Sequence, residues 1–472
     1  MNLKKATSKN IKWSFIESIS LKAIGFVLSI ILARLLAPSD FGVLAIVNVF
    51  YLLTVLFIDG GLKEALIQKK EATEDDYSTM FWLNLGIAFL LYCVLFLSAP
   101  FIESFYEYPK LAFYIRLQSL TLLIESFGLI QIVKATKDLD LKKITVARLP
   151  ATLISFLTGV GLAYSGYGIL SLIIQQLINV LLYNLLLIYK IRYAPKFSFS
   201  LVSMKSLYNY GLKMLAISFI SRLFVQSLNL IFGYYYTPSA LGVYTKSRSL
   251  QGVPIDVVNS AFTKGLYPTM VKLQSHKRLL KKIFLTNIRR LSYIMIFLNT
   301  ILFFNSLEIV VFLLGEKWTE MSAFLKIIAL GSLLHPIVNQ VSNIVKAIGK
   351  PELLLKLETF WKISVLATIL LLVGNIDFIN ILLIFVIMNS VMAFVFLYLC
   401  SKILKFNFYL ESISLLSLFG YHFLIGFFID EFVSNAVTGL VKIISFISLF
   451  MLLSLCYGSV FKKYSIKKNI FN

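Results

Sequence analysis

The polar turn inside Leu32–Val43 (LARLLAPSDFGV) decides how the chain is organised. A long apolar segment ends at the turn, and another begins directly after it, at Phe41. The pattern returns 200 residues later as YTPSALGV, so that Pro38 and Gly42 fall on Pro238 and Gly242. The recurrence predicts a duplicated unit that starts with a helix, a turn and a second helix.

The composition is that of a polytopic membrane protein. Mean hydropathy is +0.84, 58% of residues are hydrophobic and only 14% are charged. This is more apolar surface than the interior of a soluble protein of this size can bury. Apolar runs of about 20 residues, each long enough to cross the hydrocarbon as a helix, recur along the chain. We expect fourteen: residues 13–36, 41–62, 78–100, 111–135, 146–165, 168–192, 208–233, 239–262, 290–314, 322–347, 354–374, 377–402, 410–430 and 436–459.

The cations are sorted by side. Most of the 45 Lys and Arg residues fall in the N-terminal tail, the C-terminal tail and every second connection, whereas the other connections hold only Lys110, Arg116, Lys317 and Lys326. The positive-inside rule therefore predicts that both termini are cytoplasmic. The four tryptophans, Trp361 among them, fall near expected interfaces, which is typical of an aromatic belt.

The repeat extends beyond the turn. Residues 132–135 (IVKA) return at 344–347, and Ile58-Asp59 returns as Ile255-Asp256. Because six spans is an even number, the two copies insert with the same orientation, as in parallel-repeat transporters. We expect an all-α fold with two six-helix lobes, residues 1–195 and 196–405, followed by two additional helices and a basic tail, residues 406–472.

Polar stripes on expected spans 1, 7 and 8 give the candidate binding site. The 200-residue offset places Lys22 on Arg222, and Arg248 shares a helical face with Gln251, whereas Lys246 points about 200° away from Arg248. A cation near the middle of a span is costly unless it faces protein or water. We expect these stripes to line a cavity; the alternative is a hydrogen-bonded seam between helices. The candidates are Lys22, Arg222, Arg248, Ser18, Ser29, Ser218, Gln226, Asn229 and Gln251.

Acidic residues in or near the spans have two interpretations. Glu125, Asp59 and Asp256 are candidates for coupling to H+ or Na+, with Glu125 the best placed, or they neutralise nearby cations. For His335, which precedes Pro336, we favour a kinked helix with an internally bonded His over a functional role.

The sequence argues against an enzyme and predicts no cofactor. We find no nucleophile and base arrangement, no phosphate loop and no metal-ligand spacing, and the three cysteines lie separately in apolar runs. The net charge of +22 does not indicate nucleic acid, because the largest basic connection, 264–290, is amphipathic and suits an anionic leaflet.

Three stretches carry a family resemblance: ARLLAPSDFGVLAI (33–46), FIDGGLKEALIQKK (57–70) and GYYYTPSALGVYTKSRSLQGVP (233–254). They resemble bacterial lipid-linked polysaccharide repeat-unit flippases, of the superfamily that includes multidrug antiporters and the peptidoglycan-precursor flippase. The resemblance implies two six-helix lobes around a cavity whose cations engage a pyrophosphate. It implies an undecaprenyl-pyrophosphate-linked oligosaccharide that is flipped outward by alternating access across the bacterial inner membrane. The implied partners are this substrate, membrane lipids, and a polymerase with other polysaccharide-assembly proteins.

Two other functions compete with this one. A cation antiporter of the same superfamily calls for an acidic cavity, whereas the expected stripes are basic. A membrane-embedded glycan polymerase calls for a sizeable outer loop, whereas the expected outer turns are short.

Overall fold

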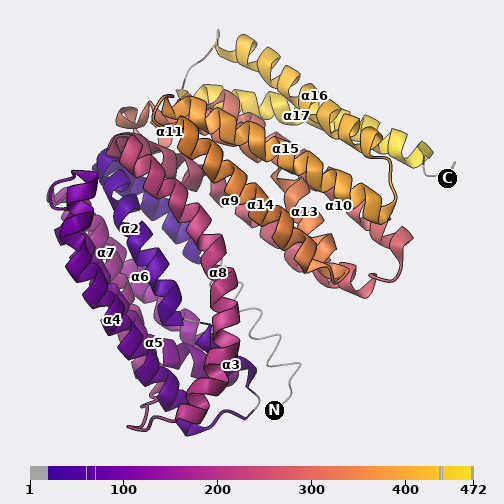
Figure 1. Ribbon diagram of the computed structural model, residues 1–472. Coiled ribbons are helices and arrows are strands. Elements are labelled where there is room, and N and C mark those ends of the chain that lie inside the picture. The colour runs from indigo at the N-terminus through magenta and orange to yellow at the C-terminus, as the bar shows by residue number, and fades with distance from the viewer. Residues whose placement is uncertain (1–19, 60, 70, 435–436, 438, 469–472) are drawn as a thin grey trace. The chain divides into compact units, whose positions relative to one another are not determined.

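The computed structural model describes residues 20–59, 61–69, 71–434, 437 and 439–468, although not every side chain in these ranges. Every regular element in this described part is a helix (Figure 1). Contacts between Cα atoms divide the chain into two compact units, Met1–Gly242 and Val243–Asn472. The expected all-α membrane fold is confirmed.

The first unit contains the helix at residues 20–35 and seven further helices before its last turn. These are α2 (Pro38–Asp59), α3 (Leu62–Gln68), α4 (Glu74–Tyr106), α5 (Leu111–Lys137), α6 (Leu141–Tyr164), α7 (Ile169–Ile191) and α8 (Leu201–Tyr235). α4 packs on α5, α6 on α7, and α8 on α2 and α3. Thr73 and Asp76 form a capping box that starts α4, satisfying backbone N–H groups that a helix start leaves unpaired.

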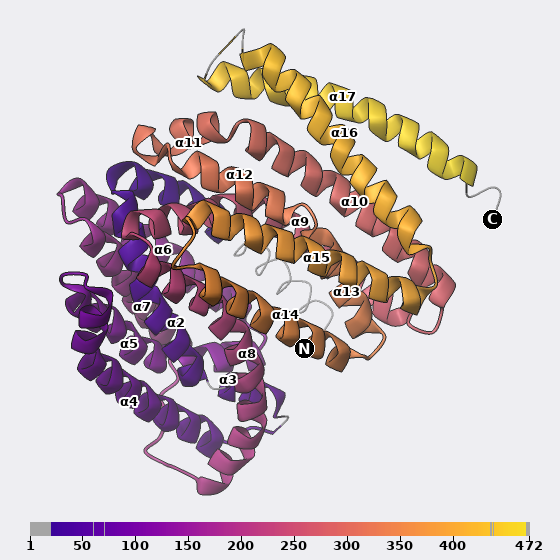
Figure 2. The same ribbon diagram turned by 45° about the horizontal axis from the view of Figure 1, so that its top comes forward.

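The second unit consists of α9 and the helices after it. These are α9 (Pro238–Lys272, which begins in the first unit), α10 (Lys277–Phe304), α11 (Ser306–Leu314), the 3-10 turn η1 (Glu316–Trp318), α12 (Met321–Ser332), α13 (His335–Ala347), α14 (Pro351–Leu372), α15 (Phe378–Leu404), α16 (Phe408–Ser434) and α17 (Gly439–Lys468). α10 packs on α12 and α16, and α13 packs on α15. Figure 2 shows α16 and α17 running side by side.

The number of membrane crossings stays a prediction. Among the described residues, eight helices are long and apolar enough to span a membrane, or nine if α10 and α11, bent by 75°, form one span. The chain is a multi-pass membrane protein, and the expected total of fourteen spans awaits a topology measurement.

The expected division of the chain into two lobes and a C-terminal addition also stays a prediction. The contact units reflect which helices pack together, and they do not test which segments are repeats. α8 opens the second repeat in the sequence, yet it packs on α2, α3 and α4 within the first unit. α16 and α17, expected as an addition, pack on α10 and α11 within the second unit.

The two copies of the repeated turn contact each other. A Cβ atom added to Gly42 would lie 1.7 Å from the carbonyl oxygen of Pro238, and one added to Gly242 would lie 1.9 Å from that of Pro38. Only glycine allows backbones to approach this closely. The sequence repeat is therefore matched by a reciprocal contact between the first turns of α2 and α9.

The connector 192–200 between α7 and α8 is fastened to the start of α4. The backbone N–H groups of Lys196 and Ser200 donate to the hydroxyls of Ser78 (3.0 Å) and Thr79 (2.9 Å), and Trp82 Nε1 donates to the Lys196 carbonyl at 2.9 Å. Tyr193 donates to Glu74 at 2.9 Å, and burial and this bond raise the pKa of Tyr193. The hydroxyl therefore keeps its proton at neutral pH and remains a donor.

Candidate functional site

The predicted cations of the first unit lie exposed on their helices. Lys22 and Arg222 are both exposed, on the helix at 20–35 and on α8, and Ser29 is half-buried. Ser18 and the side chain of Ser218 lie outside the described residues. A cation that is exposed on a mainly apolar helix has access to water or to a ligand in a way that a packed one does not.

Arg222, Glu125 and a tyrosine come together inside the first unit. Tyr51 of α2 donates its hydroxyl hydrogen to Glu125 Oε1 of α5 at 2.6 Å. Arg222 of α8 lies close enough to Tyr51 to interact with it electrostatically. The three helices pack on one another through α2, so one site on their shared surface holds a cation, a carboxylate and a hydroxyl.

Two other predicted residues of α8 bond to each other. Asn229 Nδ2 donates to Gln226 Oε1 at 3.2 Å, and Gln226 is 6% exposed. Such a bond between polar side chains is what the alternative interpretation of this stripe, a hydrogen-bonded seam, predicts, although both residues lie on one helix.

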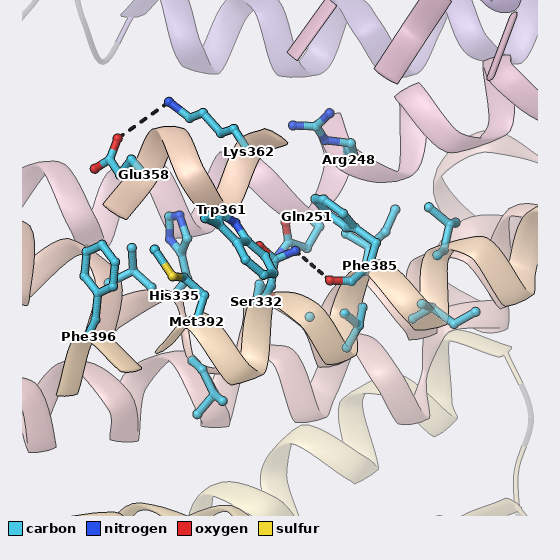
Figure 3. A pocket seen from close by; sticks show the side chains of 18 of the residues that line it. Arg248, Gln251, Ser332, His335, Glu358, Trp361, Lys362, Phe385, Met392 and Phe396 are labelled. Carbon is cyan, nitrogen blue, oxygen red and sulfur yellow. Dashed lines mark hydrogen bonds and ion pairs between the residues drawn. The ribbon is translucent and has the colours of Figure 1, made fainter. Parts of the chain in front are cut away.

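Arg248 and Gln251 line a pocket of about 410 Å³ in the second unit. Residues of α9, α12, α13, α14 and α15 form its walls. Figure 3 shows Arg248 and the Glu358–Lys362 pair along one side, with Trp361, Gln251 and Ser332 further in. Its volume is in the usual range of small-molecule sites, about 300–1,000 Å³.

A buried asparagine holds the inner wall of the pocket. Asn299 of α10 is 1% exposed, and its Oδ1 accepts from Gln251 Nε2 at 3.3 Å and from the Ser332 hydroxyl at 2.8 Å. Asn299 Nδ2 donates to the Met295 carbonyl at 2.8 Å. Because its amide nitrogen is held by the helix, Asn299 fixes how the two pocket residues are oriented.

The break between α12 and α13 brings His335 to the same pocket. Pro336 follows it at the start of α13, where the missing N–H costs nothing. Asn339 Nδ2 lies 3.3 Å from His335 Nδ1. An amide nitrogen can only donate, so Nδ1 accepts and the neutral ring carries its proton on Nε2. The structure thus shows the expected kink and internally bonded His.

Two other cations on apolar helices are neutralised by carboxylates. Lys442 of α17 pairs with Glu308 at 2.8 Å and with Asp430 at 2.9 Å, and Arg289 of α10 forms a two-pronged pair with Glu411 at 2.6 and 2.9 Å. Within the described residues, no carboxylate lies at ion-pair distance from the cations Lys22, Arg222 and Arg248. The predicted site cations therefore differ from the structural ones. Lys246, which points elsewhere, is 7% exposed.

The acidic candidates for ion coupling lie in different surroundings. Glu125 is bonded to Tyr51, Asp256 is exposed and interacts electrostatically with His335, and the side chain of Asp59 lies outside the described residues. No group of three or more His, Cys, Asp or Glu suited to a metal ion occurs in the part of the chain that was searched.

Four residues of these sites were not singled out from the sequence: Tyr51, Tyr244, Asn299 and Trp361. Tyr244 had a signal, because it precedes Arg248 by one helical turn, and its hydroxyl accepts from Arg248 Nη1 at 3.2 Å. Trp361 lines the pocket, which the aromatic-belt interpretation did not anticipate. Nothing in the sequence pointed to Tyr51 or Asn299, because only tertiary packing brings them to Glu125 and Gln251.

Polysaccharide biosynthesis proteins are similar to this chain in sequence. The lipopolysaccharide biosynthesis protein WzxC of Escherichia coli (strain K12) is 26% identical over 364 residues, 76% of this chain and 74% of the relative. The teichuronic acid biosynthesis protein TuaB of Bacillus subtilis (strain 168) is 24% identical over 344 residues, 72% and 71% of the two chains. Among solved structures, the lipid II flippase MurJ in an inward closed conformation shares the fold, with a TM-score of 0.78 at 14% identity, covering 97% of this chain and all of that one.

These similarities agree with the resemblance in the repeated turns. The model of the polysaccharide biosynthesis protein family matches residues 31–323, more than half of the chain and both copies of the turn. The chain belongs to the polysaccharide biosynthesis protein family.

Proposed function

We propose that this protein flips an undecaprenyl-pyrophosphate-linked oligosaccharide repeat unit from the cytoplasmic to the outer leaflet, in cell-surface polysaccharide biosynthesis. The transport proceeds by alternating access through a central cavity lined by cations. Both termini lie in the cytoplasm, and the membrane is the bacterial cytoplasmic membrane. A polymerase and other polysaccharide-assembly proteins act on the same intermediates.

The contrast between its two kinds of cation supports this proposal most directly. Lys442 and Arg289 are neutralised by carboxylates, whereas Lys22, Arg222 and Arg248 are exposed and have no carboxylate at ion-pair distance among the described residues. A pyrophosphate that crosses a layer of low dielectric constant loses its hydration and counterions. Fixed cations with polar neighbours replace both, through charge-assisted hydrogen bonds.

The same contrast disfavours the antiporter for cationic drugs. A cationic drug needs an exposed carboxylate without a fixed partner, and Glu125 already accepts a short bond from Tyr51. We further propose that Glu125 is the carboxylate through which transport is coupled to H+ or Na+, ions small enough to reach a carboxylate that already accepts one hydrogen bond. The bond to Tyr51 and the nearby Arg222 support this role. The names of the two sequence relatives, both polysaccharide biosynthesis proteins, also favour a glycan substrate.

The test is substitution of the two arginines. Arg222→Ala and Arg248→Ala should each lower the rate at which lipid-linked oligosaccharide reaches the outer leaflet by about tenfold or more, the worth of one lost charge-assisted contact. The measurement is complementation of a flippase-deficient strain, with radiolabelled intermediate quantified in each leaflet and protein abundance measured in parallel. Lys282→Ala removes an exposed cation of α10 and serves as the control. Wild-type transport in both arginine variants would reject the cavity assignment.

A further inference from the structure

The pocket of the second unit has more cationic than anionic groups. Of the residues that line it, Arg248 and Lys362 carry positive charge and Glu358 alone carries negative charge. Glu358 pairs with Lys362 at 3.5 Å, one helical turn apart on α14. One positive charge, that of Arg248, is therefore left for a ligand, and four of its five N–H donors remain beyond the one that Tyr244 accepts.

Neutral polar groups of the pocket suit hydroxyl groups. Gln251 uses its amide nitrogen on Asn299 and Asn389 uses its own on the Phe385 carbonyl at 2.8 Å, which leaves each side-chain oxygen as an acceptor. His335 supplies the opposite function, because its proton is on Nε2. A ligand that both donates and accepts hydrogen bonds from several positions fits this set, as a polyol does.

The remaining wall is aromatic and aliphatic. Trp361, Phe385 and Phe396 line the pocket with Val338 and Met392, and Figure 3 shows Trp361 beside Gln251. The indole presents a flat, electron-rich face that attracts weakly positive C–H groups. A sugar ring has such C–H groups on one face and hydroxyls around its edge, whereas a bare pyrophosphate has no apolar face for this wall.

We propose that this pocket binds an acidic sugar residue of the oligosaccharide, with Arg248 on its carboxylate and the ring against Trp361. The inference rests on the proposed function, because it takes the sugar to belong to the transported lipid-linked substrate. Asn299 is a positioning residue that acts through Gln251 and Ser332. This narrows the role given to Arg248 above: the substrate's pyrophosphate falls to Lys22 and Arg222, and Arg248 takes the sugar carboxylate and so selects among glycans.

The test is a titration that needs no transport. The purified full-length protein in lipid nanodiscs at pH 7 is titrated with sodium glucuronate, glucose and sodium pyrophosphate, and tryptophan fluorescence is followed at constant ionic strength. The dissociation constant obtained from the emission change should be at least about tenfold lower for glucuronate than for glucose. This factor is the worth of one carboxylate–arginine contact. Trp361→Phe should abolish the signal.

Matched variants assign the contact. Arg248→Gln should weaken the binding of glucuronate about tenfold and leave the binding of glucose unchanged. Arg248→Lys should bind glucuronate with an affinity between those of the wild type and Arg248→Gln. Asn299→Leu should weaken the binding of both sugars. Lys282→Gln, which removes an exposed charge elsewhere in the unit, should change neither. Because Arg248→Lys keeps the charge, it separates a lost contact from a lost fold, which gel filtration of each variant also checks.

Three results would overturn the inference: equal binding of glucose and glucuronate, no response to either sugar, or displacement of glucuronate by an equal concentration of pyrophosphate at Trp361. Each of these leaves the proposed function standing if cells still transport the lipid-linked oligosaccharide. The expected titration in a protein that transports none would instead reject the proposed function.

Discussion

Lys442 and Arg248 represent two ways in which an apolar helix carries a cation. Lys442 is 10% exposed in its side chain and lies between Glu308 and Asp430, so its charge is compensated inside the protein. Arg248 is exposed, donates to the Tyr244 hydroxyl and lies over the Tyr244 ring. A compensated cation holds helices together, and an exposed one remains available to a ligand.

The structural role of Lys442 gives a stability prediction. Lys442→Met should lower the free energy of unfolding by roughly 3 kcal/mol, because it leaves the carboxylates of Glu308 and Asp430 close together and without a counter-charge. Thermal unfolding of the detergent-solubilised protein measures the loss. The triple variant Lys442→Met, Glu308→Gln, Asp430→Asn removes all three charges and should recover much of it. A single variant as stable as the wild type would contradict the structural role.

At the scale of the element, the start of α2 and the start of α9 depend on each other. Each first turn presents a glycine to the proline carbonyl of the other, so the backbones meet with no side chain between them. The sequence predicted that the two turns are copies and fixed their register. It contained no sign that the copies would touch, because a repeat shows which positions are equivalent and not which are adjacent.

Gly42→Ala and Gly242→Ala should therefore each destabilise the fold by at least about 1–3 kcal/mol, since the added methyl group meets backbone atoms that cannot rotate away. The melting temperature and the yield of folded protein measure the effect. Gly86→Ala in α4 is the matched control: nothing lies within 4 Å of the added atom, and alanine favours a helix. Equal behaviour of the three variants would show that the turns are not in contact.

Over the whole molecule, the sequence predicted the helical membrane fold and most helix positions, because apolar periodicity and length report burial in lipid directly. The duplication predicts a boundary between lobes near residue 195, and this division stays a prediction. The contact units divide at Gly242 instead, because α8 packs on α2. Of the candidate site, the stripes on one helix, such as Arg248 with Gln251, were predictable from helical spacing. Trp361 and Asn299 were not, because they reach the pocket from other helices.

The distribution of charge along the chain predicts its topology in the membrane. The connections at 137–143, 192–200, 272–277 and 346–351 each carry two or more Lys or Arg residues. Moving these cations across the membrane is costly, so we expect them on the cytoplasmic side. A fluorescent reporter that folds only in the cytoplasm should be active when fused after Asn472, and alkaline phosphatase at the same position should be inactive. The same pair inserted after Tyr108, in an outer turn, should give the reverse, and an active phosphatase at the C-terminus would mean an odd number of crossings.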